Sequence, residues 1–323
     1  MPTVFDTLFG NLMVPTILFF VLGLVAAAVR SDLAIPAGAA KFLSLYLLLA
    51  IGFKGGHSLG EHGLRADLFA AIAVGLLLSF ALPFLAFLLL RALTRLDATT
   101  AAAVAGHYGS ISIVTFVAAT SLLDLSGIKF DGYMVAVAAS MEVPAILSAL
   151  WIAGRYAGDT STKGVPAREL LTNGSVVLLV GAFVIGAVTQ DKGMAMIAPF
   201  VVTPFTGILC IFMLDMGITA GSNLLKNRHM LSAGLFGFGM LMPLLSSLLA
   251  LGLGAAIGLQ TGSLFLLMVL AASASYIAVP AAMRIALPKA NPGIYLTLSL
   301  GVTFPFNITL GLPLYLWLAG LMG

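Results

Sequence analysis

The chain has 323 residues, of which 61% are hydrophobic and only 8% are charged, and its formal net charge is +3. Soluble domains contain about 25% charged residues, so this composition excludes a soluble enzyme and a disordered tail. With only 15 Lys and Arg, the chain also lacks the basic surface that binding to nucleic acid requires. The composition predicts a polytopic membrane protein, and the single cysteine, Cys210, leaves no intrachain disulfide to form.

Hydropathy divides the chain into ten predicted membrane spans, each near the length of about 20 apolar residues that a spanning helix requires. In chain order they are residues 12–30, 38–54, 66–92, 98–123, 131–154, 170–189, 197–224, 230–258, 263–287 and 292–321. No cationic stretch precedes the first span, because the first Arg is Arg30. We therefore expect this span to stay in the mature chain and not to be removed as a signal peptide.

The basic residues between these spans predict how the chain is oriented. If the spans alternate in direction, eleven of the 15 Lys and Arg fall on one side of the membrane and four on the other. Because Lys and Arg are enriched in cytoplasmic loops, we expect both termini to face outward. The longest hydrophilic segment, residues 155–169, is then a cytoplasmic connecting loop.

Three motifs recur at nearly constant spacing in the two halves of the chain. They pair Gly52 with Gly217, Ser110 and Ser112 with Ser273 and Ser275, and Val143 and Pro144 with Phe304 and Pro305. One such match in apolar sequence arises easily by chance, but three in the same order favour an internal repeat. Two five-span halves, residues 1–154 and 170–323, must have opposite orientations, which is the inverted-repeat architecture of secondary transporters. We predict one integrated membrane domain.

Spans four and nine each contain a run of small and polar residues at corresponding places, which predicts that both helices are broken there. Irregular backbone at membrane depth is tolerated where it faces a polar cavity, and the helix that follows a break presents free N–H groups to an anion. Ser110, Ser112, Ser273 and Ser275 are candidate helix caps or oxygen ligands for a hard cation. The alternative interpretation is that these small residues only allow close helix packing.

Ionisable and polar residues deep inside spans are further candidates for ion coupling. Glu142 in span five and Asp215 in span seven are each suited to bind a cation, to carry a proton or to neutralise a buried base. Lys54 occupies a related place in the repeat, so it either pairs with Asp215 or extends to the outer membrane surface. Thr303 and Asn307 lie on either side of Pro305, and their oxygens could complete a cation site.

The last two spans carry most of a resemblance to a known family. The landmarks are Ser273, Ser275, Pro280, Arg284, Pro288, Asn291, Pro292, Tyr295, Pro305, Gly311, Pro313 and Tyr315. Further matches are Gly52, Gly55, Gly56, the break at residues 106–112 and the run Met141, Glu142, Val143 and Pro144. In this pattern the chain is similar to the sodium-dependent bicarbonate transporter family, whose cyanobacterial members carry Asp in place of Glu142.

The resemblance implies ten spans in two inverted repeats, with bicarbonate at the crossing of the two broken helices, and sodium as the coupling ion without another cofactor. Carried over to this chain, it implies an anion site of Gly109, Ser110, Ile111 and Ser112, faced by Ser273 and Ser275. With the polar residues above, it places sodium at Ser112, Glu142, Ser275 and Asn307. It also implies a homotrimer in the lipid of a bacterial inner membrane, and control by a small PII-like signalling protein.

Two departures from the cyanobacterial pattern bear on these expectations. Tyr276 replaces an Asp beside the crossing, which removes a carboxylate and leaves the number of sodium ions, and the driving ion itself, open. The connecting loop at residues 155–169 is short where cyanobacterial members have a long insertion, which leaves the signalling partner open.

The leading hypothesis is a sodium-coupled bicarbonate symporter that works by alternating access. The alternative is a sodium- or proton-coupled transporter of another small anion or organic acid, with Glu142 as the proton carrier. A remote alternative is an intramembrane enzyme, because His107 and Ser110 are three residues apart and could hydrogen-bond. No acid that would orient the histidine is evident in this motif, so we expect no enzyme.

Overall fold

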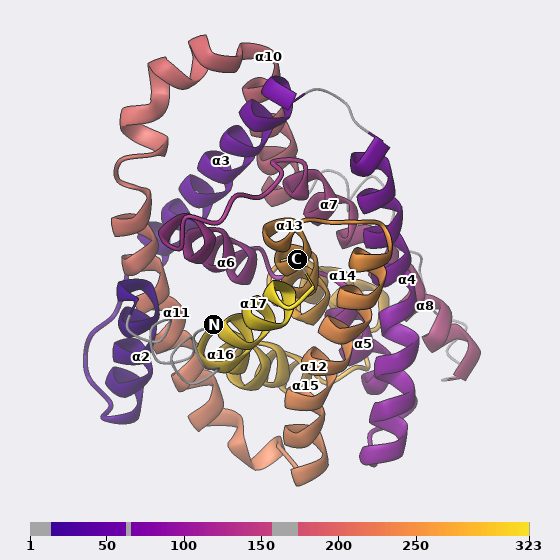
Figure 1. Ribbon diagram of the computed structural model, residues 1–323. Helices are drawn as coiled ribbons and strands as arrows, with labels where there is room; N and C mark the ends of the chain where they lie inside the picture. Colours follow the sequence, from indigo (N-terminus) through magenta and orange to yellow (C-terminus); the bar gives the residue numbers. More distant parts are fainter. Residues whose placement is uncertain (1–13, 63–65, 157–173, 323) are drawn as a thin grey trace.

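The computed structural model describes residues 14–62, 66–156 and 174–322 (Figure 1). All regular elements in these ranges are helices. Most of the predicted connecting loop at residues 155–169 lies outside the described residues, as do the first two residues of the predicted first span and the first four of the sixth.

The helices follow the hydropathy pattern closely. They are α2 (Pro15–Ala28), α3 (Ala37–His62), α4 (Ala66–Leu93), α5 (Ala98–Gly109), α6 (Ile113–Leu125), α7 (Met134–Ser140), α8 (Glu142–Tyr156), α10 (Gly174–Val201), α11 (Phe205–Asn227), α12 (Ala233–Ala256), α13 (Thr261–Ala272), α14 (Ala278–Ala286), α15 (Pro292–Leu296), α16 (Phe304–Phe306) and α17 (Leu312–Gly320). Within the described residues, eight helical segments are long and apolar enough to cross a membrane. The first and ninth predicted spans begin with the shorter apolar helices α2 and α13.

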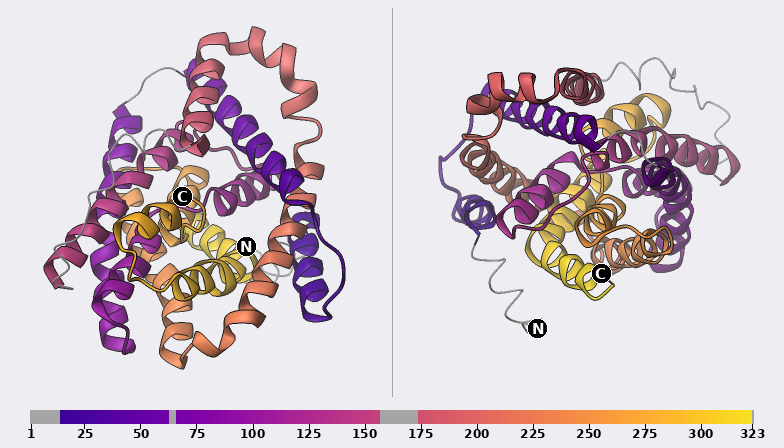
Figure 2. Two further views of the ribbon diagram at one scale, coloured as in Figure 1. Left: turned by 180° about the vertical axis from the view of Figure 1, so that it is seen from behind. Right: turned by 45° about the horizontal axis from the view of Figure 1, so that its top comes forward.

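Four helices form a group at one side of the molecule, in which α3 packs along α10 and α2 packs along α11 (Figure 2). Glycines lie at both contacts, with Gly52 and Gly56 of α3 against α10 and Gly217 of α11 against Gly23 of α2. Small residues of this kind let membrane helices approach closely. We call α2, α3, α10 and α11 the outer group and the remaining helices the core group.

Helix α10 bends sharply at Gln190, whose φ of 48° and ψ of −141° are not helical. Its first part follows α3 towards Gly60, whereas its second part returns along α3, where the Tyr46 hydroxyl donates to the Phe200 carbonyl oxygen at 2.6 Å. The predicted end of span six at residue 189 therefore falls at this bend, but span seven was predicted to begin too early. Residues 197–201 belong to α10, and α11 begins at Phe205.

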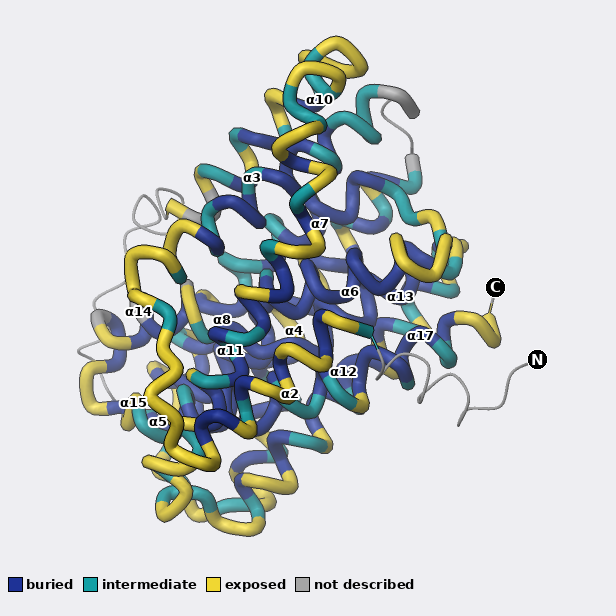
Figure 3. The backbone as a smooth tube through the Cα atoms, turned by 90° about the vertical axis from the view of Figure 1, so that its left-hand side faces the viewer, coloured by how far each residue is buried: buried dark blue, intermediate teal, exposed yellow. Residues whose placement is uncertain are grey.

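The core group surrounds the two segments that were predicted to be broken. Nearly all residues of α5 and α6 are buried, and every residue of α13 from Gly262 onward is buried as well. Figure 3 shows α6 and α13 within the buried interior, while α10 is exposed along much of its length. The interruptions of both spans thus lie inside the protein, where irregular backbone is tolerated at membrane depth.

Candidate functional site

The two interrupted spans meet at their breaks. Helix α5 ends at Gly109 and α6 begins at Ile113, whereas α13 ends at Ala272 and α14 begins at Ala278. The Ser112 amide donates to the Ser273 hydroxyl oxygen at 2.8 Å. The Ser275 amide donates to the His107 carbonyl oxygen, also at 2.8 Å. The serines that the sequence singled out in spans four and nine are therefore brought together, and the extended segments are hydrogen-bonded to each other.

Local sequence explains why the chain leaves and re-enters a helix at the first break. The hydroxyl oxygen of Ser112 accepts from the Thr115 amide at 3.3 Å and from the Thr115 hydroxyl at 2.9 Å, so Ser112 caps the start of α6. A β-carbon at Gly109 would overlap Pro83 and the Ser79 carbonyl oxygen of α4. Gly109 therefore allows a close approach of α5 and α4. That Gly109 also contacts an anion remains a prediction from the sequence.

A third interruption places a carboxylate beside this crossing. Helix α7 ends at Ser140, and Glu142 is the first residue of α8. The Ser110 hydroxyl donates to Oε2 of Glu142 at 3.1 Å, and the Ser79 hydroxyl donates to the Met141 carbonyl oxygen. An acidic side chain in the first turn of a helix is favoured by the positive end of the helix dipole. The sequence predicted span five without a break, and residues 134–156 are together long and apolar enough to cross a membrane as one segment.

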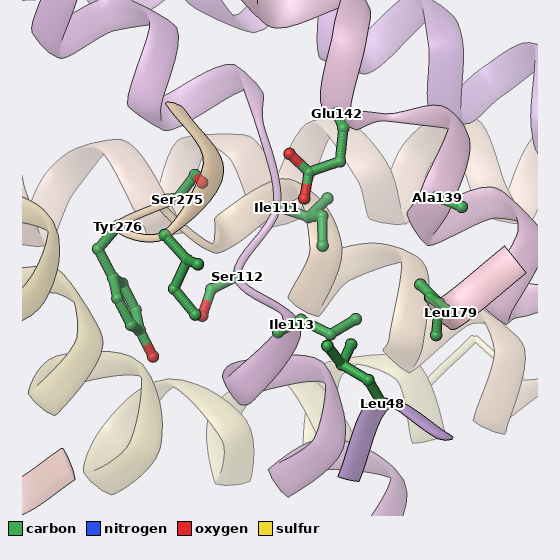
Figure 4. Close-up of a pocket in the computed structure, with 10 residues that line it drawn as sticks. Leu48, Ile111, Ser112, Ile113, Ala139, Glu142, Leu179, Ser275 and Tyr276 are labelled. Carbon is green, nitrogen blue, oxygen red and sulfur yellow. The ribbon is translucent and has the colours of Figure 1, made fainter. Parts of the chain in front are cut away.

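A small cavity of about 20 Å³ lies at the crossing. Its polar lining comes from Ser112, Ser275, Tyr276 and Glu142, and its apolar lining from Leu48, Ile111, Ile113, Ala139, Leu179 and Ile277. In Figure 4, Glu142 and Ser275 lie on opposite sides of the extended segment between α5 and α6. Of the predicted residues, Ile111, Ser112, Glu142 and Ser275 thus face one common space.

This arrangement combines the requirements of an anion and a cation. The starts of α6 and α14 direct amide groups with partial positive charge towards the crossing. The Glu142 carboxylate and the hydroxyls of Ser112 and Ser275 are hard oxygen donors, which alkali and alkaline-earth cations prefer. Among the described residues, there is no group of three or more His, Cys, Asp or Glu that could hold a metal ion. A single carboxylate with hydroxyls is suited to a monovalent cation.

Two residues predicted to complete the cation site hold the core helices together. The Thr303 hydroxyl donates to the Gly239 carbonyl oxygen at 2.7 Å and lies 2.6 Å from the Tyr108 hydroxyl. The Asn307 amide donates to the Ala272 carbonyl oxygen at 2.8 Å, and its oxygen accepts from the Tyr315 hydroxyl at 2.9 Å. Neither side chain lines the cavity at the crossing, and their role as sodium ligands remains a prediction.

Asp215 and Lys54 do not pair with each other. The Lys54 ammonium lies 3.1 Å from Oδ2 of Asp124, at the end of α6, whereas Asp215 lines a separate cavity beside Tyr276. The sequence expected Lys54 either to pair with Asp215 or to extend to the surface, and it did not suggest Asp124. The pairing brings together residues 70 positions apart on different spans, for which a single sequence carries no signal.

The hydrogen bond considered for an enzyme is not formed. Nδ1 of His107 lies 2.7 Å from the Ala103 carbonyl oxygen, and the ring stacks on Tyr295 with 4.4 Å between the ring centres. The Ser110 hydroxyl instead donates to Glu142. These contacts leave the pair of His107 and Ser110 without the nucleophile–base geometry that the enzyme alternative requires.

Comparison with known proteins identifies the family. The sequence matches the Na+-dependent bicarbonate transporter superfamily over residues 15–320, and the chain belongs to this superfamily. No curated protein sequence matches the chain. The resemblance inferred from the motifs is thereby confirmed, and the apolar helices together with the family identify an integral membrane protein of a transporter family.

Proposed function

We propose that the protein is a sodium-coupled symporter that imports bicarbonate across a bacterial inner membrane by alternating access. The observation that carries this proposal is the crossing itself, where the starts of α6 and α14 and the carboxylate of Glu142 meet at one cavity. Anions bind at helix starts through backbone amides, and a carboxylate beside them supplies a site for the co-transported cation.

The anion is held at the two breaks in this proposal. Ser112 and Ser275 contribute hydroxyls, and the first turns of α6 and α14 contribute amide groups that have no backbone partner within their own helices. The Ser110 hydroxyl supports the site by donating to Glu142. Ser273 supports the site from behind, because its hydroxyl oxygen accepts from the Ser112 amide and its proton is donated to the Leu270 carbonyl oxygen. A small monoanion needs no lysine in such a site.

Sodium is held beside the anion by Glu142, Ser112 and Ser275. Moving an isolated ion out of water costs several kcal/mol, whereas two opposite charges that enter together offset part of each other's cost. Glu142 is the only charged residue in the described lining of this cavity. Sodium therefore neutralises the carboxylate, and the anion then binds next to a site without net charge.

The ten-span inverted repeat is the architecture within which this mechanism operates. It is supported by the matched glycine contacts, since Gly52 and Gly56 pack on α10 as Gly217 packs on α2. The halves at residues 1–154 and 170–323 then have opposite orientations, with both termini outside. Trimer formation and a PII-like partner are carried only by the family resemblance.

Uptake into proteoliposomes tests the proposal. Purified protein is reconstituted, and accumulation of radiolabelled bicarbonate is measured at fixed pH with and without an inward sodium gradient, using protein-free liposomes as the control. We expect accumulation that depends on the sodium gradient. Absence of accumulation by protein that is verified to be inserted, in tight vesicles, would contradict the proposal.

The apolar lining of the cavity favours one alternative substrate class. Leu48, Ile111, Ile113, Leu179 and Ile277 would contact the carbon skeleton of a small organic acid more favourably than they contact bicarbonate. Competition by unlabelled short-chain carboxylates in the same assay distinguishes the two. A carboxylate that accumulates in response to the sodium or proton gradient, when bicarbonate does not, would establish this alternative.

A further inference from the structure

A second cavity lies next to the crossing, between the outer group and the connection from α13 to α14. It has a volume of about 250 Å³. Residues of α3, α11 and the α13–α14 connection line it, together with one from the last span: Ala40, Ser44, Phe212, Asp215, Met216, Thr219, Tyr276, Ile277 and Leu300. Tyr276 and Ile277 also line the cavity at the crossing, so the two spaces share one wall.

Asp215 is the charged residue of this second cavity. It is only 8% exposed, and its carboxylate has no hydrogen-bond or ion-pair partner among the described residues. No Lys, Arg or His belongs to the described lining, and the Lys54 ammonium is already paired with Asp124 at 3.1 Å. An ionised carboxylate inside a membrane protein requires a compensating charge, and here the protein side chains do not provide one.

Three hydroxyl side chains from different segments line the same cavity as this carboxylate. Ser44 reaches the cavity from α3, Thr219 lies one helical turn after Asp215 on α11, and Tyr276 enters from the α13–α14 connection. One carboxylate with three hydroxyls provides hard ligands with a single negative charge. Because there is no second acidic residue in the described lining, the charge balances a monovalent cation and not a divalent one.

We propose that the cavity around Asp215 is a second sodium site, in which Asp215 supplies the charge and Ser44, Thr219 and Tyr276 supply hydroxyl oxygens. This inference deepens the sodium-coupled transport proposed above and rests on it for the identity of the ion. Tyr276 and Ile277, which border both cavities, connect the second site to the first. The protein then binds two sodium ions, one at Glu142 and one at Asp215.

Direct binding of radioactive sodium to the purified protein, without transport, tests this site. At a sodium concentration that just saturates the wild-type protein with two ions, we expect Asp215→Asn and Glu142→Gln each to bind about one ion and the double variant fewer than one. Asp191→Asn serves as the matched control, because this aspartate has a side chain that is 86% exposed and pairs with His57 outside both cavities. The control should bind two ions.

Each outcome either supports or overturns the second site. Binding of two sodium ions by a folded Asp215→Asn protein would overturn the second site. This is also the result expected if Asp215 binds only a proton.

If Asp215→Asn does not fold, Thr219→Val provides the test, since it removes one proposed ligand at nearly constant volume. In Thr219→Val, we expect sodium to bind at least about fivefold more weakly at one of the two proposed sites. Unchanged sodium affinity at both sites would overturn the second site. If the wild-type protein does not take up bicarbonate, but Asp215→Asn binds one sodium ion fewer than the wild type, the proposed substrate would be refuted and the second sodium site would stand.

Discussion

At the scale of single residues, Glu142 links the crossing helices to the charge that the proposed sodium ion requires. Its carboxylate accepts a hydrogen bond from Ser110 of the first break while it begins α8. The residue therefore has a structural contact and a free charge at once. A variant that keeps the contact but removes the charge separates these two contributions.

Glu142→Gln is such a variant, because glutamine has the same shape and its oxygen still accepts from Ser110. We expect the sodium concentration for half-maximal uptake to rise about tenfold, which corresponds to about 1.4 kcal/mol, because a charged ligand is replaced by a neutral one. The bicarbonate KM at saturating sodium should change much less. A sodium titration of uptake measures the effect, and an unchanged titration curve would refute the role of Glu142 as a ligand.

Asn307 illustrates a buried polar residue whose contacts are structural. It connects the end of α13, at the Ala272 carbonyl oxygen, with the Tyr315 hydroxyl of α17. Asn307→Ala leaves both partners buried without this hydrogen bond, which costs about 1–3 kcal/mol for each unsatisfied group. We expect a clearly lower midpoint of thermal unfolding in detergent.

The matched control for Asn307 is Ser246→Ala. Ser246 is also buried, but its hydroxyl donates to the Met242 carbonyl oxygen within the same helix, where the backbone bond remains after truncation. We expect a much smaller shift in the unfolding midpoint. Equal shifts for the two variants would contradict the role of Asn307 as a link between α13 and α17.

At the scale of elements, the contact of α3 with α10 depends on glycine. A β-carbon at Gly52 would lie 2.6 Å from the Leu179 carbonyl oxygen, and one at Gly56 would overlap the Phe183 carbonyl oxygen even more severely. Because backbone atoms cannot move aside as a flexible side chain can, the two helices would have to separate. The outer group is therefore held together by contacts that tolerate no added volume at these positions.

Gly56→Ala tests this contact, and Gly181→Ala is the control on the partner helix. No atom lies within 4 Å of the position that a β-carbon would take at Gly181, so alanine there adds helix propensity without a clash. We expect Gly56→Ala to lower the unfolding midpoint and the yield of monodisperse protein, and Gly181→Ala to leave both unchanged or slightly improved. Similar behaviour of the two variants would show that the close approach is not required.

Hydropathy and small polar residues predicted the elements well, but not their directions. The runs of small and polar residues predicted interruptions within residues 106–112 and 272–280, and the helices end and restart within or directly beside these ranges. The predicted end of span six at residue 189 coincides with the bend at Gln190, but hydropathy did not show that the returning residues 191–201 belong to the same helix.

At the scale of the whole molecule, both cavities lie at the boundary between the outer group and the core group. Leu48 of α3 and Leu179 of α10 face Glu142 and Ser275 across the first cavity. Ser44 of α3 and Asp215 of α11 face Tyr276 across the second. Movement of one group past the other would therefore change access to both cavities together, which alternating access requires. The sequence could not predict this boundary, because it depends on which helices pack together.

One ion pair crosses the same boundary, and it provides a test of the movement. Lys54 belongs to α3 in the outer group and Asp124 to α6 in the core group. By contrast, His57 and Asp191, 2.9 Å apart, both belong to the outer group, on α3 and α10. A covalent link at the first pair would fix the two groups relative to each other, whereas a link at the second would not.

We therefore expect opposite effects from two cross-links in a background with Cys210→Ala. Treatment of Lys54→Cys/Asp124→Cys with a short, reducible thiol cross-linker should lower uptake to the level of protein-free liposomes, and reduction of the link should restore it. His57→Cys/Asp191→Cys should keep its uptake after the same treatment, with cross-linking in both verified by mass spectrometry. Normal uptake by fully cross-linked Lys54→Cys/Asp124→Cys would mean that transport proceeds without relative movement at this boundary. The ion pair would then be a fixed contact, and the moving parts would have to lie within the core group.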